Sequence, residues 1–127
     1  PGRVVALFDW EMATLGDPLT DLGYTLVYWG EESDPPTQTR EGTRQALTAK
    51  PGFLTRVELV EEYARRSGRD VQAMDFYQAL AHTKLAVISE GIHARFLKGK
   101  TVGEGFDFAG PQAERLAERA LEFANRL

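Results

Sequence analysis

The first thirty residues constrain this chain most, because an apolar run there ends in two carboxylates. Residues 4–8 are continuously apolar rather than alternating, which is typical of a strand covered on both faces. If the strand continues, its period of two places Asp9 and Glu11 on the same side. Mg²⁺ binds through one or two carboxylates plus substrate phosphates. The sequence therefore predicts a metal and phosphate site where this strand ends.

A second group of carboxylates follows at the start of a predicted helix. Asp17 suits the N-cap, Pro18 the first helical position, and Asp21 the first turn, where negative charge favours the helix dipole. Apolar residues at helical spacing carry this helix to about Trp29. Taken alone, Asp17 is most simply a cap, and Asp9 is most simply a strand-end residue bonded to a turn.

Taken together, these motifs resemble those of a known family. The stretch FDWEMATLGDPLTDLGYTLVYW (residues 8–29) is similar to the metal-binding segment of the aminoglycoside phosphotransferase-like and choline kinase-like small-molecule kinases. The similarity continues through residues 51–70 and 77–99, so it covers nearly the whole chain. The segment also resembles the kinase domains fused to acyl-CoA dehydrogenases. A hydroxyacyl-CoA or similar acceptor therefore rivals an aminoglycoside, and the absence of a marked carboxylate excess in the later helices favours the former.

The resemblance implies an α+β protein-kinase-like fold, of which residues 1–127 are the C-terminal, metal- and substrate-binding lobe. This part is mostly helical, with one N-terminal strand. The implied function is ATP- and Mg²⁺-dependent transfer of the γ-phosphoryl group to a hydroxyl of a small molecule. Asp9 then holds the Mg²⁺ that bridges the ATP phosphates. Glu11 is either a second metal contact or a group that orients the backbone, while Asp17 and Asp21 support the site.

Part of the machinery that such a kinase needs does not occur in this sequence. The family's His-x-Asp-x-x-x-x-Asn catalytic loop is absent, and Gly103-Glu104-Gly105 is too short for a nucleotide-binding loop. An isolated strand also lacks a partner. We therefore expect the catalytic base and the N-terminal lobe to lie upstream of Pro1. Residues 1–127 alone should bind Mg-ATP poorly and transfer nothing.

The rest of the chain predicts three more helices around a long connection. Thr55 and Glu58 form a capping box for a helix that stops at Gly68, and Asp70 caps a long helix that runs to about Lys98. Pro111 opens the last helix. Residues 30–52 are irregular, with a possible polar helix over residues 38–49, and either line a substrate entrance or form a solvated loop.

The long helix carries the remaining candidate site residues. The chain's two histidines, His82 and His93, lie about 16 Å apart along this helix and cannot share a metal, so we interpret them as surface or satisfied core residues. By the resemblance, the substrate cleft borders this helix. Four of its residues are candidates to line the cleft: Tyr77, Glu90, His93 and Arg95.

The composition of the chain limits which partners and functions are expected. With 15 Lys and Arg against 19 Asp and Glu and no basic stripe, nucleic acid is not expected as a partner. Cysteine is absent, and no apolar run approaches the ~18 residues of a membrane span, so we expect a soluble, cytoplasmic protein. The oligomeric state is not predicted. Two other functions remain open: a non-catalytic helical scaffold derived from a kinase, and a Mg²⁺-dependent hydrolase.

Overall fold

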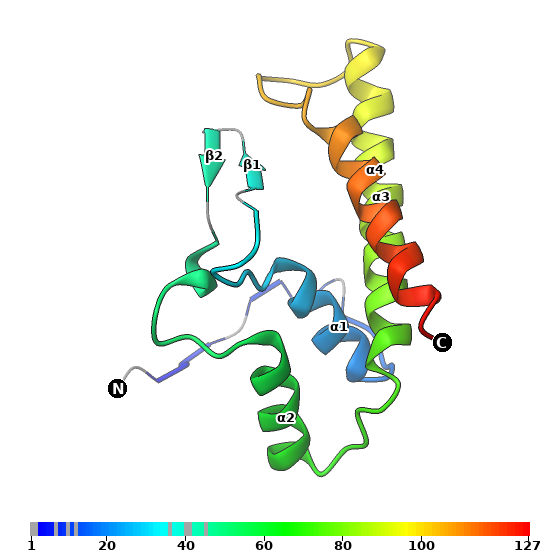
Figure 1. The fold of residues 1–127 in the computed structure, drawn as a ribbon. Helices are drawn as coiled ribbons and strands as arrows, with labels where there is room; N and C mark the ends of the chain where they lie inside the picture. The colour runs from blue at the N-terminus through cyan, green and yellow to red at the C-terminus, as the bar shows by residue number, and fades with distance from the viewer. Residues whose placement is uncertain are drawn as a thin grey trace.

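Helices make up most of the computed structural model, which describes residues 3–6, 8–9, 11, 13–35, 37–39, 42–44 and 46–127. The elements in chain order are α1 (Leu19–Tyr28), β1 (Thr37–Thr39), β2 (Gly42–Arg44), a 3-10 helix (Leu47–Ala49), α2 (Arg56–Ser67), α3 (Met74–Leu97) and α4 (Ala109–Ala124). The long helices α3 and α4 run antiparallel side by side, and α1 packs against α3 (Figure 1).

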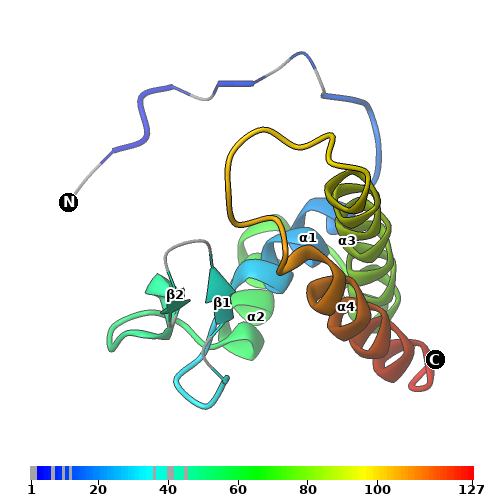
Figure 2. The same cartoon turned by 90° about the horizontal axis from the view of Figure 1, so that it is seen from above.

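The predicted N-terminal strand is not present in the described residues. Residues 3–6 and 8–9 carry no strand, and Val4, Val5 and Phe8 expose 78%, 84% and 88% of their surfaces. This segment runs apart from the helices (Figure 2). The physical reason is the missing ladder: β1 and β2, the strands of the described residues, pair with each other. Without a neighbouring strand, an apolar run cannot satisfy its backbone groups as a strand.

The prediction for α2 is confirmed in detail. Thr55 is the N-cap, its hydroxyl accepts from the Glu58 N–H, and the Glu58 carboxylate accepts from the Thr55 N–H at 2.7 Å. The helix stops at Gly68, whose φ of 69° lies in the left-handed region that glycine adopts readily. All these determinants lie within α2 and its caps, so the sequence alone was enough to predict where this helix begins and ends.

Other helix boundaries differ from the predictions by a few residues. α1 begins at Leu19 with Pro18 at the N-cap, although the Asp17 carboxylate still accepts from the Leu19 N–H. α3 begins at Met74 rather than after Asp70, because the Asp70 carboxylate bonds the Gln72 N–H in a preceding turn. In the long connection, β1, β2 and the 3-10 helix occupy the stretch over which the sequence predicts a polar helix; that prediction is wrong.

The core around α1 depends on a close helix contact. Leu19, Leu22 and Leu26 of α1 are buried with Met74 of α3, and side chains of α2 pack against this cluster. α1 approaches α3 so closely that a Cβ at Gly23 would lie 2.8 Å from the Tyr77 carbonyl oxygen. Glycine at this position therefore sets the distance between the two helices.

Small residues likewise allow α4 to lie directly on α3. A Cβ at Gly110 would lie 2.6 Å from the His93 ring. The residues of α4 that are buried in this packing are Ala109, Gly110, Ala113, Ala120 and Phe123.

Helix α3 also exposes apolar side chains, among them Leu80, Val87 and Ile88. None of the helices in the described part of the chain is both long and apolar enough to cross a membrane.

We predict that Gly23→Ala destabilises the fold by about 1–3 kcal/mol, because the added methyl group meets backbone that cannot move aside. Gly91→Ala in α3 is the matched control, since nothing lies within 4 Å of the position that its Cβ would take, and alanine is favoured in a helix interior by about 0.5–1 kcal/mol. Urea denaturation gives both free energies of unfolding. Equal effects of the two substitutions would contradict the close contact.

Candidate functional site

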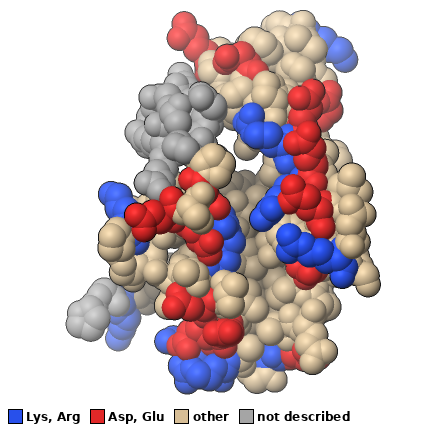
Figure 3. Space-filling model, viewed as in Figure 1, with Lys and Arg blue, Asp and Glu red and all other residues tan. Residues whose placement is uncertain are grey.

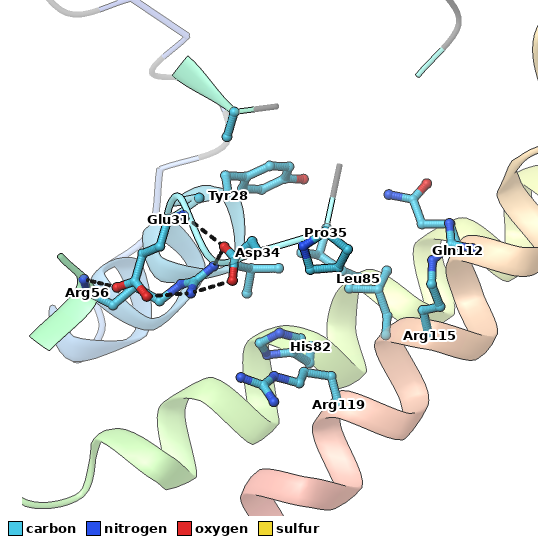
Figure 4. A pocket seen from close by; sticks show the side chains of 14 residues that line it. Tyr28, Glu31, Asp34, Pro35, Arg56, His82, Leu85, Gln112, Arg115 and Arg119 are labelled. Carbon is cyan, nitrogen blue, oxygen red and sulfur yellow. Dashed lines mark hydrogen bonds and ion pairs between the residues drawn. The ribbon is translucent and has the colours of Figure 1, made fainter. Parts of the chain in front are cut away.

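A cavity of about 350 Å³ opens between the loop that follows α1 and the pair α3 and α4 (Figure 4). Its walls combine apolar side chains with charged ones. The apolar part comes from Val27, Pro35, Ala46, Leu85 and Leu116, and the polar part from Tyr28, Glu31, Asp34, Arg56, His82, Gln112, Arg115 and Arg119. A concave site of this composition suits a small molecule that has an apolar body and a polar group.

The first wall is held by one arginine between two carboxylates. The Arg56 guanidinium bonds Asp34, with Nη1 3.1 Å from Oδ1, and lies 3.3 Å from Glu31 Oε2. The Arg56 backbone N–H donates to Glu31 Oε1 at 2.6 Å, and the Glu31 N–H donates to Asp34 Oδ2 at 2.8 Å. The loop after α1 is thus fastened to the first residue of α2.

Burial alone would raise the pKa of Asp34, but its hydrogen bonds outweigh this effect. The bonds from Arg56 and from the Glu31 N–H, together with the charges of Arg56 and Arg119, hold the pKa of Asp34 below its ordinary value. The influence of Arg119 matters for the geometry, because this residue belongs to α4. Its charge is therefore felt across the cavity.

The opposite wall carries further cations. Gln112, Arg115 and Arg119 of α4 line the cavity, and Lys and Arg side chains border the hollow in the space-filling view (Figure 3). Arg119 pairs with Glu122 and stacks on the Phe123 ring, 4.9 Å from its centre. Arg115 makes no ion pair with a described residue. It is the free cation of this wall within the described part of the chain.

His82 lines the same cavity from α3. Its Nδ1 lies 2.7 Å from the Gln78 carbonyl oxygen, which can only accept, so Nδ1 carries the hydrogen. Burial lowers the pKa of His82, the bond to Gln78 opposes this shift, and the charges of Arg119 and Arg56 lower it further. The ring is therefore neutral at pH 7, as the interpretation of a satisfied core histidine implies.

The predicted metal ligands lie outside this cavity, on the N-terminal segment. Asp9 and Glu11 are exposed, and neither carboxylate makes a hydrogen bond or an ion pair with another described residue. Asp9 has a φ of 71° and is the one residue other than glycine with positive φ in the described ranges. That conformation is uncommon and clusters at functional sites, although aspartate tolerates it better than most residues.

The donor set at these positions fits Mg²⁺, which needs only one or two carboxylates beside phosphate and water oxygens. Among the described residues, no three His, Cys, Asp or Glu side chains gather in a ready-made metal cluster. Metal binding by Asp9 and Glu11 therefore stays a prediction.

The two predicted supporting aspartates differ in their surroundings. Asp17 accepts hydrogen bonds from the Tyr77 hydroxyl at 2.6 Å and from the Leu19 N–H at 2.9 Å, and these bonds hold its pKa below the ordinary value. The same bond raises the pKa of Tyr77. Asp21 is exposed, and its carboxylate has no partner among the described residues. Asp17 thus ties the start of α1 to α3.

The four candidates for the substrate cleft do not line the cavity. Tyr77 bonds Asp17, near the beginning of α3. Glu90 and His93 lie one turn apart, with Oε2 3.8 Å from Nδ1, and the His93 ring faces Gly110 of α4. Arg95 is exposed in the last turn of α3. A cleft at these residues remains a prediction.

Comparison with known proteins identifies the family. Residues 1–80 match the model of the phosphotransferase enzyme family. Over 98% of its length, the chain is 33% identical to acyl-CoA dehydrogenase family member 11 of Gallus gallus and 32% identical to acyl-CoA dehydrogenase family member 10 of Mus musculus. It is 29% identical to probable acyl-CoA dehydrogenase IBR3 of Arabidopsis thaliana. No solved structure is significantly similar to it.

The chain belongs to the phosphotransferase enzyme family. It spans 16%, 12% and 15% of the lengths of these three relatives. Their names agree with the predicted similarity to kinase domains fused to acyl-CoA dehydrogenases. Family membership implies a kinase-like fold, and the described residues are mostly helical, as predicted.

Sequence reasoning missed the charged residues of the cavity. Glu31 and Asp34 lie in a loop whose sequence predicts only irregular structure, and the sequence around Arg56 predicts only a capped helix. One signal was available: Gln112, Arg115 and Arg119 follow each other at helical spacing and so share a face of the last helix. The partners of that face depend on how the loop after α1 folds back.

We predict that Arg56→Met lowers the free energy of unfolding by about 1–3 kcal/mol, because two carboxylates lose their shared partner. Since the pKa of Asp34 is depressed in the folded protein, its stabilising effect exists above the unfolded pKa of about 3.9 and is lost as pH falls through the folded value. The difference in free energy of unfolding between Arg56→Met and wild type should therefore narrow as the pH falls below about 4.

Arg95→Met serves as the control, because Arg95 is exposed and makes no ion pair with a described residue. Its effect should stay within about 0.5 kcal/mol at all these pH values. Denaturant titrations at several pH values measure both variants. An Arg56→Met effect that grows toward acid pH would overturn the assignment.

Proposed function

We propose that this chain is part of an ATP- and Mg²⁺-dependent phosphotransferase that moves the γ-phosphoryl group of ATP to a hydroxyl of a small molecule. The observation that carries the proposal is Asp9: an exposed carboxylate with positive φ, free of partners among the described residues, within the segment that matches the family. A carboxylate so presented is open to a metal and its phosphates.

In this proposal, Asp9 binds Mg²⁺, and Glu11 contacts the ion directly or through water. When bound, the ion neutralises charge on the transferred phosphoryl group. Asp17 holds the start of α1 against α3 through Tyr77 and thereby supports the segment before it. Asp21 supports the site from the first turn of α1. Positioning and charge stabilisation are most of what phosphoryl transfer requires of a protein.

We further propose that residues 1–127 form the C-terminal, metal- and substrate-binding part of the phosphotransferase domain, with the base on other residues of that domain. The exposed apolar side chains on α3 support this proposal, because a helix that is apolar on several faces is normally covered on all of them. The acceptor is a hydroxyacyl-CoA-like or aminoglycoside-like molecule, and the names of the relatives favour the former.

The test uses the natural full-length protein that contains this chain, with γ-labelled ATP and Mg²⁺. We expect label to pass to a hydroxyacyl-CoA and the transfer to stop when EDTA removes the metal. Asp9→Asn should lower kcat at least about a hundredfold, because the charge that binds the metal is lost.

Asp107→Asn, at an exposed carboxylate in the loop before α4, is the control and should leave kcat unchanged. Release of labelled phosphate without any acceptor would indicate a hydrolase instead. Failure to turn over ATP with any hydroxyl compound would favour a binding scaffold.

A further inference from the structure

The cavity is lined by an arginine whose charge no ion pair with a described residue neutralises. Three arginines and two carboxylates line it, and His82 is neutral. Arg56 is occupied by Glu31 and Asp34 through the bonds described above. Arg56, Glu31 and Asp34 together carry one negative charge, and the unpaired positive charge of the cavity lies on the α4 wall.

Arg115 is the residue that presents this charge. Arg119 has Glu122 as a partner, whereas Arg115 makes no ion pair or hydrogen bond through its side chain within the described ranges. Arg115 lies beside Gln112, whereas Arg119 reaches toward His82 (Figure 4). A guanidinium offers a planar fork of donors that matches the oxygens of a carboxylate or a phosphate.

Two neutral polar side chains line the same cavity, Tyr28 and Gln112. Burial and a hydrogen bond with Tyr24 raise the pKa of Tyr28 to about 12, so the Tyr28 hydroxyl keeps its hydrogen at pH 7. Gln112 adds an amide that can donate as well. Leu85 and Leu116 also line the cavity, and their apolar side chains suit a hydrocarbon chain.

We propose that this cavity binds the anionic group of the acceptor, a carboxylate or a phosphate carried on an apolar chain, with Arg115 as its principal partner. The inference rests on the proposed function, since it names the chemical class of that acceptor. It disfavours polycationic acceptors, because the unpaired guanidinium of Arg115 repels them.

The experiment measures binding to the full-length protein by isothermal titration calorimetry, with four probes that share one six-carbon chain. Hexanoate and hexyl phosphate carry the anion, hexanol is neutral, and hexylamine is cationic. We expect an anionic probe to bind at least about tenfold more tightly than hexanol and hexylamine, and more weakly as salt is raised. The better of the two anions identifies the group as carboxylate or phosphate.

Arg115→Gln should weaken binding of that anion at least about fivefold and leave hexanol binding unchanged. Lys100→Gln removes an equal charge from the loop after α3 and should leave the binding of both the anion and hexanol unchanged. Preference for hexylamine, no binding of either anion, or an Arg115→Gln variant that binds like wild type would each overturn the proposal. Anion binding without phosphoryl transfer to any acceptor would instead reject the proposed function alone.

Discussion

The cavity exists because one guanidinium holds two carboxylates on the loop that leaves α1. Arg56 stands at the first position of α2, so its backbone N–H is one of the groups that the helix leaves unbonded, and Glu31 accepts it. The side chain of the same residue engages Asp34. A single residue thus fastens this loop to the start of α2. It also offsets one of the two negative charges that face the arginines of α4.

The second constraint is the closeness of the helices. Gly23 brings α1 against α3, and Gly110 brings α4 against the same helix from another side. Because α3 contacts both α1 and α4, its apolar residues are spread around the helix and are not confined to one face. Leu80 and Ile88 are among those that remain exposed. The cavity lies where these two packings diverge, since α1 ends while α3 and α4 continue (Figure 1). Helix packing therefore sets its position, and the loop after α1 closes it.

What the sequence predicted correctly was determined by neighbouring residues. The capping box of Thr55 and Glu58 and the stop at Gly68 are complete within the helix they bound. The predicted strand at residues 4–8 is not present in the described residues 3–6 and 8–9, because a strand depends on a partner elsewhere in the chain. The cavity was not predicted for the same reason. Glu31 and Arg56 are 25 residues apart in sequence, and no local pattern indicates their hydrogen bond. The family motif, by contrast, needs no contact to be recognised.

Helix α1 links the two regions to which we assign function. Its start is tied to α3 by Asp17 and follows the segment that carries Asp9, while its end leads directly into Glu31. Ten residues of helix extend about 15 Å. An acceptor that contacts Arg115 with its anionic group must therefore be long if its hydroxyl is to approach phosphates held near Asp9. An extended acyl chain has this form, and it also matches the apolar side chains that line the cavity. The opposite charges of the two regions, carboxylates for a metal and a guanidinium for an anion, then act on different parts of the same reaction complex.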